Sequence, residues 1–161
     1  MILPLQTGQN NPILRRKARE VKEITPEIKR LILDMKETME KAEGLGLAGP
    51  QIGHSVRVII AKPNEETIIL INPQIKKFSR KKVIAEEGCL SLLNQFYLIE
   101  RPAEIKVEGL DQRAKKIKIK ADGLLARIIQ HEIDHLDGVL IIDRIDDKKT
   151  LSQNYDSEAE F

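Results

Sequence analysis

Two of the three histidines of this chain stand four residues apart, in the segment His131-Glu132-Ile133-Asp134-His135. On a helix, residues four apart share one face, so both imidazoles can reach one metal ion at about 2.0–2.1 Å. Glu132 is close enough to take a proton from metal-bound water without ligating the metal. The alternative is a pair of solvated or core histidines beside an unrelated glutamate. Because the pattern lies inside an apolar helical segment, it favours the metal site.

A catalytic metal site usually has three protein ligands and one open position, so a third ligand is needed. Downstream of the histidines the chain offers acids, among them Asp137, Asp143 and Asp146. Upstream stands the single cysteine, Cys89. A lone cysteine is usually a small buried residue, but a thiolate with two imidazoles forms a site suited to Zn²⁺ or Fe²⁺. We therefore favour Cys89 over a downstream acid.

A glycine-rich segment runs from Gly44 to Gln51. It follows a predicted helix instead of preceding one, so it does not fit a phosphate-binding loop. Its small residues would let a substrate backbone approach, and the Gln51 amide can donate to a developing oxyanion. The alternative is a helix C-cap followed by a turn.

Together these three segments resemble the signatures of the peptide deformylase family. The family patterns are Gly-x-Gly-Leu-Ala-Ala-x-Gln, Glu-Gly-Cys-Leu-Ser and Gln-His-Glu-x-Asp-His, which match residues 44–51, 87–91 and 130–135 in the same order. The likeness extends from the N-terminal helix to Arg144. Gly49 replaces the second alanine of the first pattern, a departure that we expect to be tolerated.

The resemblance implies a metal-dependent hydrolase that removes the formyl group from the N-terminal formylmethionine of nascent polypeptides and releases formate. It implies one divalent ion, natively Fe²⁺, with Zn²⁺, Ni²⁺ or Co²⁺ as substitutes. The implied metal ligands are Cys89, His131 and His135. The resemblance assigns the proton transfer to Glu132 and the stabilisation of the oxyanion to the Gln51 side chain and the Leu90 N–H.

The implied substrate site consists of Leu45, Gly46, Arg127 and Ile128, with the peptide extended along an edge strand near Gly46. Arg127 stands where the family usually has an apolar residue that lines the methionine pocket. Either its guanidinium extends to solvent, or the pocket prefers a different first side chain. We expect extension to solvent.

The elements that must position these residues follow from periodicity. Thr25 and Pro26 predict the start of a helix, and Gly44 its end. Apolar residues on one helical face lie between them, at Ile28, Leu31, Ile32, Met35, Met39 and Ala42. A second helix is predicted from Asp122 to Gly138, with apolar residues on more than one side.

Alternating or β-branched runs predict strands at 56–61, 67–71, 104–110, 115–120 and 139–142. Asn72-Pro73 should end the second of them, and the segment 109–113 should be the turn between the third and fourth. The expected fold class is α+β, with antiparallel sheets packed around a central metal-binding helix and with an N-terminal helix.

The 161 residues suit one domain, 1–161, with a polar C-terminal tail from about residue 145. The net charge of +2 argues against a direct nucleic-acid function. The absence of a leader pattern, of a long apolar stretch and of a cysteine pair predicts a cytoplasmic protein without a membrane partner. The implied partners are formylated nascent-peptide N-termini, with transient contact to the ribosome.

Two rival functions remain open. A small zinc endopeptidase with the same histidine pattern would need a third ligand downstream, so replacing Cys89 would leave its metal in place. A metal-binding module without activity would keep the three ligands but would gain nothing from Glu132 or Gln51. The presence of both residues favours catalysis.

Overall fold

A computed structural model describes residues 1–145 of the chain as three α-helices and two antiparallel β-sheets. The helices are α1 (Pro12–Arg15), α2 (Pro26–Lys41) and α3 (Gly123–Leu136). The larger sheet has the strand order β1-β2-β3-β6-β7. Its strands are β1 (Gly46–Ala48), β2 (Val58–Ala61), β3 (Ile68–Phe78), β6 (Glu104–Leu110) and β7 (Lys116–Asp122). The smaller sheet pairs β4 (Lys82–Cys89) with β5 (Leu92–Pro102). The predicted α+β class with antiparallel sheets is therefore confirmed.

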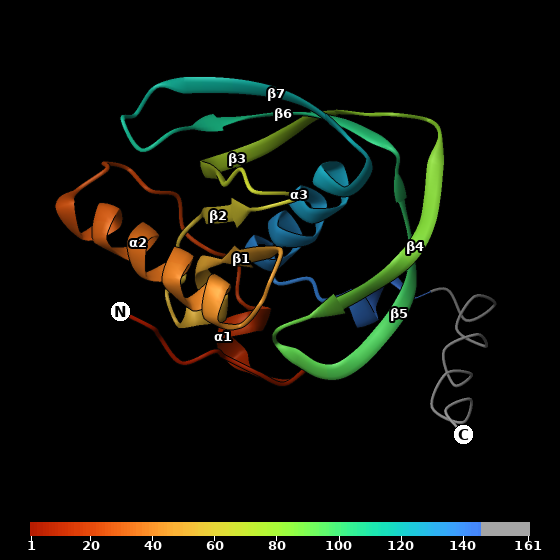
Figure 1. Cartoon of the computed structure of the whole chain (residues 1–161), viewed down its shortest axis with the longest axis horizontal. Coiled ribbons are helices and arrows are strands. Elements are labelled where there is room, and N and C mark those ends of the chain that lie inside the picture. Colours follow the sequence, from red (N-terminus) through yellow and green to blue (C-terminus); the bar gives the residue numbers. More distant parts are fainter. Residues whose placement is uncertain (146–161) are drawn as a thin grey trace.

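Helix α3 lies at the centre of the molecule (Figure 1). The larger sheet covers one side of it, while the curved β4–β5 ribbon passes around another side. Helix α2 lies on the opposite face of the larger sheet, so the two helices have separate hydrophobic cores. This arrangement places the predicted metal-binding helix between the two sheets.

Strand β2 shows how the two cores are divided. Ile59 and Ala61 belong to the cluster that contains α3, whereas Val58 and Ile60 belong to the cluster that contains α2. All four side chains are buried, because successive side chains of a strand point to opposite faces and both faces are covered here. A strand covered on both faces loses the polar alternation, which explains its unbroken apolar sequence.

Helix α2 begins as predicted, because the Thr25 side chain accepts a hydrogen bond from the backbone N–H of Ile28 and Pro26 occupies the first turn. Its predicted end at Gly44 needs a correction. The left-handed residue after the helix is Glu43, with φ of 55°, and the N–H of Gly44 donates to the carbonyl of Met39. The helix therefore ends in a Schellman-type turn with Glu43 at the left-handed position.

Two further expectations differ from the structure. Asn72-Pro73 does not end β3, because Asn72 takes a positive φ of 51° and a register shift carries the strand on to Phe78. Residues 139–142 form no strand, since a 3₁₀ turn covers Ile141–Arg144 and Asp143 caps it. The β4–β5 ribbon was not predicted as a pair of strands. The predicted polar tail lies, beyond residue 145, outside the described residues.

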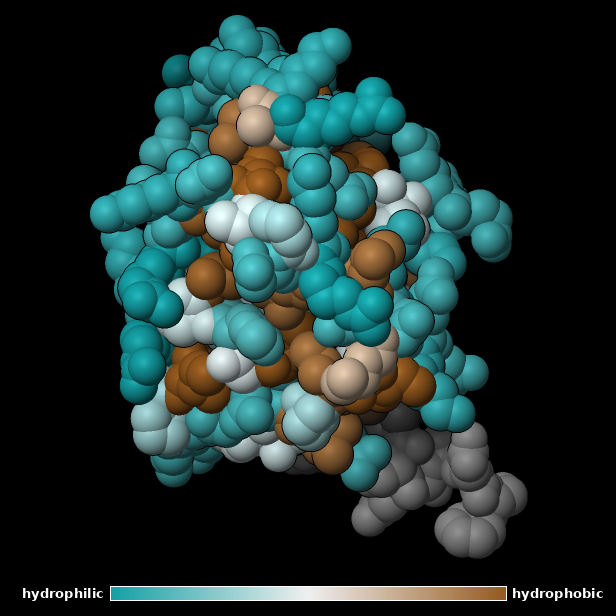
Figure 2. Space-filling view, turned by 90° about the vertical axis from the view of Figure 1, so that its left-hand side faces the viewer, coloured by the Kyte–Doolittle hydropathy of each residue, from teal (hydrophilic) through white to brown (hydrophobic). Residues whose placement is uncertain are grey.

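The face that carries α2 is mainly hydrophilic, with separate hydrophobic patches (Figure 2). Its exposed apolar side chains include Leu33 of α2 and the N-terminal Ile2. None of the helices in the described part of the chain is both long enough and apolar enough to cross a membrane.

Candidate metal centre

Cys89, His131 and His135 come together between the end of β4 and the C-terminal half of α3. The Nε2 atoms of the two histidines lie 3.2 Å apart, and the Sγ of Cys89 lies 3.2 Å from the Nε2 of His135. All three potential ligand atoms lie within 4.8 Å of one another. The structure thus brings together the three residues predicted as ligands.

The donor atoms fit a small divalent cation. With zinc–nitrogen and zinc–sulfur distances of about 2.0–2.3 Å, the ligand atoms of a tetrahedral site are separated by roughly 3.3–3.6 Å. The observed separations of 3.2 Å are close to that range. Of the downstream acids, Asp137 and Asp143 pair instead with Arg57 and Arg15. Asp146 lies outside the described residues.

His131 is oriented by a buried carboxylate. Its Nδ1 lies 2.9 Å from Oε1 of Glu87, which leaves Nε2 directed at the other two ligands. Arg101 also holds Glu87, through Nε at 2.6 Å and a terminal nitrogen at 2.9 Å. Burial alone would raise the pKa of Glu87, but the hydrogen bonds and charges of His131 and Arg101 outweigh it and lower the pKa to about 2. Glu87 is therefore an anion at neutral pH.

Glu132 lies in the same site and is 4% exposed. Its Oε2 is buried and has no hydrogen-bond partner among the described residues. Burial, together with the charges of Glu87 and Asp134, raises the pKa of Glu132 to about 7 against the opposing effect of His131 and Arg101. A carboxylate with a pKa near neutrality can both accept and return a proton.

Gly46 allows Glu132 to occupy this position. A Cβ atom at Gly46 would lie 2.4 Å from Oε1 of Glu132 and 2.8 Å from Cγ2 of Ile128. The glycine-rich segment 44–51 therefore has a role that was not predicted: Gly46 makes room for the Glu132 carboxylate.

Gly49 is also closely surrounded. A Cβ atom there would lie 2.7 Å from the carbonyl oxygens of both His54 and Val56. An alanine at this position would therefore require the backbone around His54 and Val56 to shift. The His54 side chain itself is exposed and lies outside the centre.

The Gln51 side chain is 1% exposed and faces the metal centre. Its carbonyl oxygen accepts a hydrogen bond of 2.9 Å from the N–H of Ala48, which directs the amide nitrogen the other way. That nitrogen lies 3.3 Å from Oγ of Ser91 and 3.8 Å from Sγ of Cys89. Leu90 is adjacent to Cys89 and lines the same cleft. Two potential donors thus flank the cysteine.

The centre opens into a cleft of about 410 Å³. The residues predicted for the substrate site all line this cleft: Leu45, Gly46, Arg127 and Ile128. Leu45, Leu93, Phe96 and Leu124 are about half exposed at its rim, so the cleft presents apolar surface to solvent. An extended peptide with an apolar first side chain fits these surroundings.

The expectation that Arg127 extends to solvent is wrong. Its side chain is 13% exposed, and its guanidinium donates to Oε2 of Glu87 at 2.5 Å. It also donates to the carbonyls of Ile99 and Val83, at 2.9 and 2.7 Å. The Arg127 guanidinium turns inward because the Glu87 carboxylate and two carbonyls of the β4–β5 ribbon accept its hydrogen bonds there.

A family model for polypeptide deformylase matches residues 4–151. The chain belongs to the peptide deformylase family. A peptide deformylase from Desulforudis audaxviator is 47% identical over 135 residues, which are 83% of this chain and 88% of that protein. The crystal structure of the Thermotoga maritima deformylase has a TM-score of 0.88 at 38% identity, covering 91% of this chain and 99% of that one.

A deformylase structure from Acinetobacter baumannii with bound Met-Ala-Ser has a TM-score of 0.86 at 33% identity, covering 90% of this chain and 99% of that one. These findings confirm the resemblance that the three patterns indicated.

Arg101 lies outside the three deformylase patterns and was not predicted to belong to the site. It is 3% exposed and donates to Asp134 at 2.9 Å as well as to Glu87. One signal was present: Arg101 lies two residues after Ile99, which is fully buried, and alternate residues of a strand share a face. That alternation places Arg101 inside the molecule.

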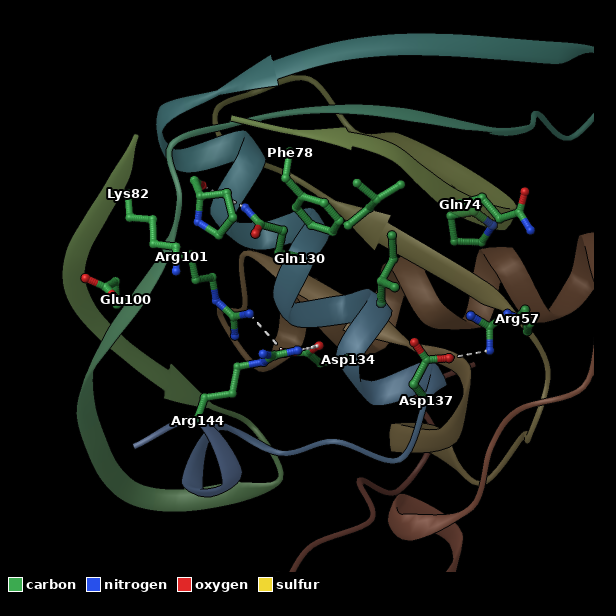
Figure 3. Close-up of a pocket in the computed structure, with 14 residues that line it drawn as sticks. Arg57, Gln74, Phe78, Lys82, Glu100, Arg101, Gln130, Asp134, Asp137 and Arg144 are labelled. Carbon is green, nitrogen blue, oxygen red and sulfur yellow. Dashed lines mark hydrogen bonds and ion pairs between the residues drawn. The ribbon is translucent and has the colours of Figure 1, made fainter. Parts of the chain in front are cut away.

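A second cavity, of about 570 Å³, lies on the other face of α3 (Figure 3). Arg101 and Arg144 meet Asp134 there, and Arg57 pairs with Asp137. Both acids thus form ion pairs with arginines. This distinguishes the cavity from the cleft, where Oε2 of Glu132 has no hydrogen-bond partner among the described residues.

Proposed function

We propose that this protein hydrolyses the formyl amide of N-terminal formylmethionine in nascent polypeptides and releases formate. The observation that carries the proposal is the buried, unpartnered Oε2 of Glu132 beside the Cys89, His131 and His135 cluster. Membership of the deformylase family supports the reaction, and the Met-Ala-Ser complex of the Acinetobacter relative supports a peptide of that kind as the ligand.

Cys89, His131 and His135 would hold one divalent ion, which we propose to be Fe²⁺ natively, with Zn²⁺, Ni²⁺ or Co²⁺ as substitutes. When bound, such an ion activates water and polarises the formyl carbonyl. Cysteine and histidine ligands suit this group of metals. The carboxylate of Glu87 would keep the His131 ring in the tautomer that ligates through Nε2.

Glu132 would carry the proton. Its carboxylate accepts a proton from the attacking water as a C–O bond forms at the formyl carbon. It returns that proton to the leaving amine as the C–N bond breaks, which yields formate and a free N-terminus. Its raised pKa suits both steps.

The amide nitrogen of Gln51 and the backbone N–H of Leu90 would stabilise the tetrahedral oxyanion. The bond between Ala48 and the Gln51 carbonyl supports this role, because it fixes the direction of the amide nitrogen. A donor of this kind contributes about 3–4 kcal/mol in other oxyanion holes.

The peptide would lie along β1, which is an edge strand of the larger sheet. Backbone hydrogen bonds to such an edge ignore most side chains and suit an enzyme that acts on many nascent chains. Leu45, Gly46 and Ile128 would line the path, and Arg127 would contribute its methylene stem. Formylated N-termini arise during translation, so the proposal includes transient ribosome contact and the cytoplasm as the compartment.

Formate release from formyl-Met-Ala-Ser, by protein prepared anaerobically and loaded with Fe²⁺, tests the proposal. We expect formate in proportion to the added protein. A fully metal-loaded sample that releases none would reject the deformylase function and favour the inactive metal-binding module.

Cys89→Ala separates the deformylase from the endopeptidase alternative. We expect this variant to lose both its metal and formate release. Full metal occupancy in Cys89→Ala, with cleavage of internal peptide bonds, would instead support a downstream ligand.

A further inference from the structure

We propose that Arg127 is a positioning residue that holds Glu87 and, through it, the ligand His131. The inference rests on the metal site proposed above. Arg127 lies on α3, four residues before His131, and its guanidinium is 2.5 Å from Oε2 of Glu87. Oε1 of the same carboxylate contacts Nδ1 of His131 at 2.9 Å. One carboxylate thus connects the guanidinium to the ligand.

Glu87 is held from two sides. Arg101 reaches it from the interior, where the Arg101 side chain is 4% exposed and also pairs with Asp134. Arg127 reaches it from the cleft side, where its own side chain is 13% exposed. Without Arg127, the carboxylate would keep only the two contacts from Arg101 and the one to His131 among the described residues, and nothing would hold it from the cleft side. We expect Oε1 then to be held less firmly in its place opposite His131.

The second histidine has no comparable support. Nδ1 of His135 is buried without a hydrogen-bond partner among the described residues. Of the two imidazoles, His131 is therefore the one that a side chain orients. Partners that orient metal-ligating histidines typically change metal affinity about 10–100-fold when they are removed. Disturbing Glu87 should accordingly be visible in metal binding.

Arg127 has two separable parts. Its guanidinium binds Glu87 and the carbonyls of Val83 and Ile99, which connects α3 to both strands of the β4–β5 ribbon. Arg127 also lines the cleft, and we assign this contact to its aliphatic stem. Methionine keeps an unbranched apolar stem of similar length but has no donor, whereas lysine keeps a stem and one charged donor. These two substitutions separate the holding of Glu87 from the shape of the cleft.

The test is the equilibrium affinity for Zn²⁺, measured by competition with a chelating dye. We expect Arg127→Met to bind Zn²⁺ about 10-fold more weakly than the unaltered chain. We expect Arg127→Lys to stay within about 3-fold of it, because the ammonium can still pair with Glu87. Arg80→Met serves as the control, since Arg80 is an exposed residue between β3 and β4, and it should bind Zn²⁺ normally.

A double-mutant comparison shows whether Arg127 acts through Glu87. Glu87→Gln should weaken Zn²⁺ binding, and adding Arg127→Met to it should cause less than about a 2-fold further loss. Independent losses in the double variant, or normal affinity in Arg127→Met, would overturn the proposal. If the unaltered chain itself does not bind Zn²⁺, the proposed metal site fails instead.

Two further readouts exclude a purely structural role. Circular dichroism of the metal-loaded proteins should show folded chains, with the unfolding temperature of Arg127→Met lowered far less than its Zn²⁺ affinity. With formyl-Met-Ala-Ser, kcat should fall in Arg127→Met while KM is preserved, because the stem that lines the cleft remains. Equal losses of stability and affinity in the Met and Lys variants would show that Arg127 only attaches the ribbon. Should Arg127→Met not fold, Arg127→Gln takes its place with the same expected loss.

Discussion

The two faces of α3 differ in whether their buried polar and charged groups have partners. On the cleft face, Glu132 and His135 each keep a buried polar atom without a partner among the described residues. On the opposite face, Asp134 pairs with Arg101 and Arg144, and Asp137 pairs with Arg57 (Figure 3). These groups belong to one helix of fourteen residues, apart from Asp137, which directly follows its last residue. The difference therefore arises from what surrounds the helix.

Leaving a buried polar group unpaired costs about 1–3 kcal/mol, so such groups persist where they serve another purpose. The unpaired Oε2 of Glu132 lies in the proposed metal site, and the unpaired Nδ1 belongs to a histidine that directs Nε2 at the other two ligands. The paired acids instead attach the helix to the rest of the fold. Arg101 is the link between the faces, because it contacts both Glu87 and Asp134. We therefore assign a structural role to the larger cavity and the proposed chemistry to the smaller cleft.

The largest effect on activity is expected from replacing Glu132 on the cleft face. Glu132→Ala should lower kcat for formate release by about 100- to 10,000-fold, because it removes the proton-transfer group. Metal content should be unchanged, since Glu132 is not among the three ligands. Steady-state kinetics together with elemental analysis would check this. Loss of the metal in this variant would contradict the assigned role.

Glu87 should contribute to stability in a pH-dependent way. Its pKa in the folded chain is about 2, below the ordinary value of 4.5, so the ionised form stabilises the fold by about 3 kcal/mol. This contribution is complete above about pH 4.5 and is lost as the pH falls towards 2. Urea unfolding of the metal-free chain and of Glu87→Gln, from pH 7 to about 2.5, should show the difference shrinking with acidity. A difference that does not vary with pH would refute the explanation.

Gly46→Ala tests how closely the cleft face is packed. The added methyl group would displace the Glu132 carboxylate, and misplacement by about 1 Å can cost about 100-fold in kcat. Zn²⁺ affinity should stay the same. Gly123→Ala is the matched control, because its Cβ would meet nothing within 4 Å and only its φ of +52° is strained. Gly123→Ala should lower the unfolding temperature and leave kcat intact. An unchanged kcat in Gly46→Ala would contradict the prediction, because it would show that the Glu132 carboxylate has room to move.

The smallest effect is expected on the other face. Asp137 is 43% exposed where it pairs with Arg57, so Asp137→Asn should cost no more than about 1 kcal/mol of unfolding free energy. Formate release should be normal. A clear loss of kcat would mean that this face takes part in the reaction, and the contrast between the faces would fail.

Much of the fold followed from periodicity. The start of α2, the β6–β7 pair and the position of α3 were predicted correctly, because their apolar residues repeat with one period over a full element. The β4–β5 ribbon was missed, since the outer part of β4 is exposed and its sequence shows no simple alternation. The 139–142 segment was predicted as a strand from its β-branched residues, but it packs against the β4–β5 ribbon without joining its ladder, and Asp143 caps a 3₁₀ turn there instead.

The sequence by itself determined the ligand types and their spacing: two histidines four apart on an apolar helix, one cysteine and one adjacent glutamate. A helix fixes the geometry of residues four apart, so these positions could be inferred locally. Only the tertiary structure decided what surrounds them. Arg101 and Arg127 reach Glu87 from different elements, and Gly46 makes room for Glu132 from a distant strand. Such contacts depend on how sheets pack around the helix, which no local pattern encodes.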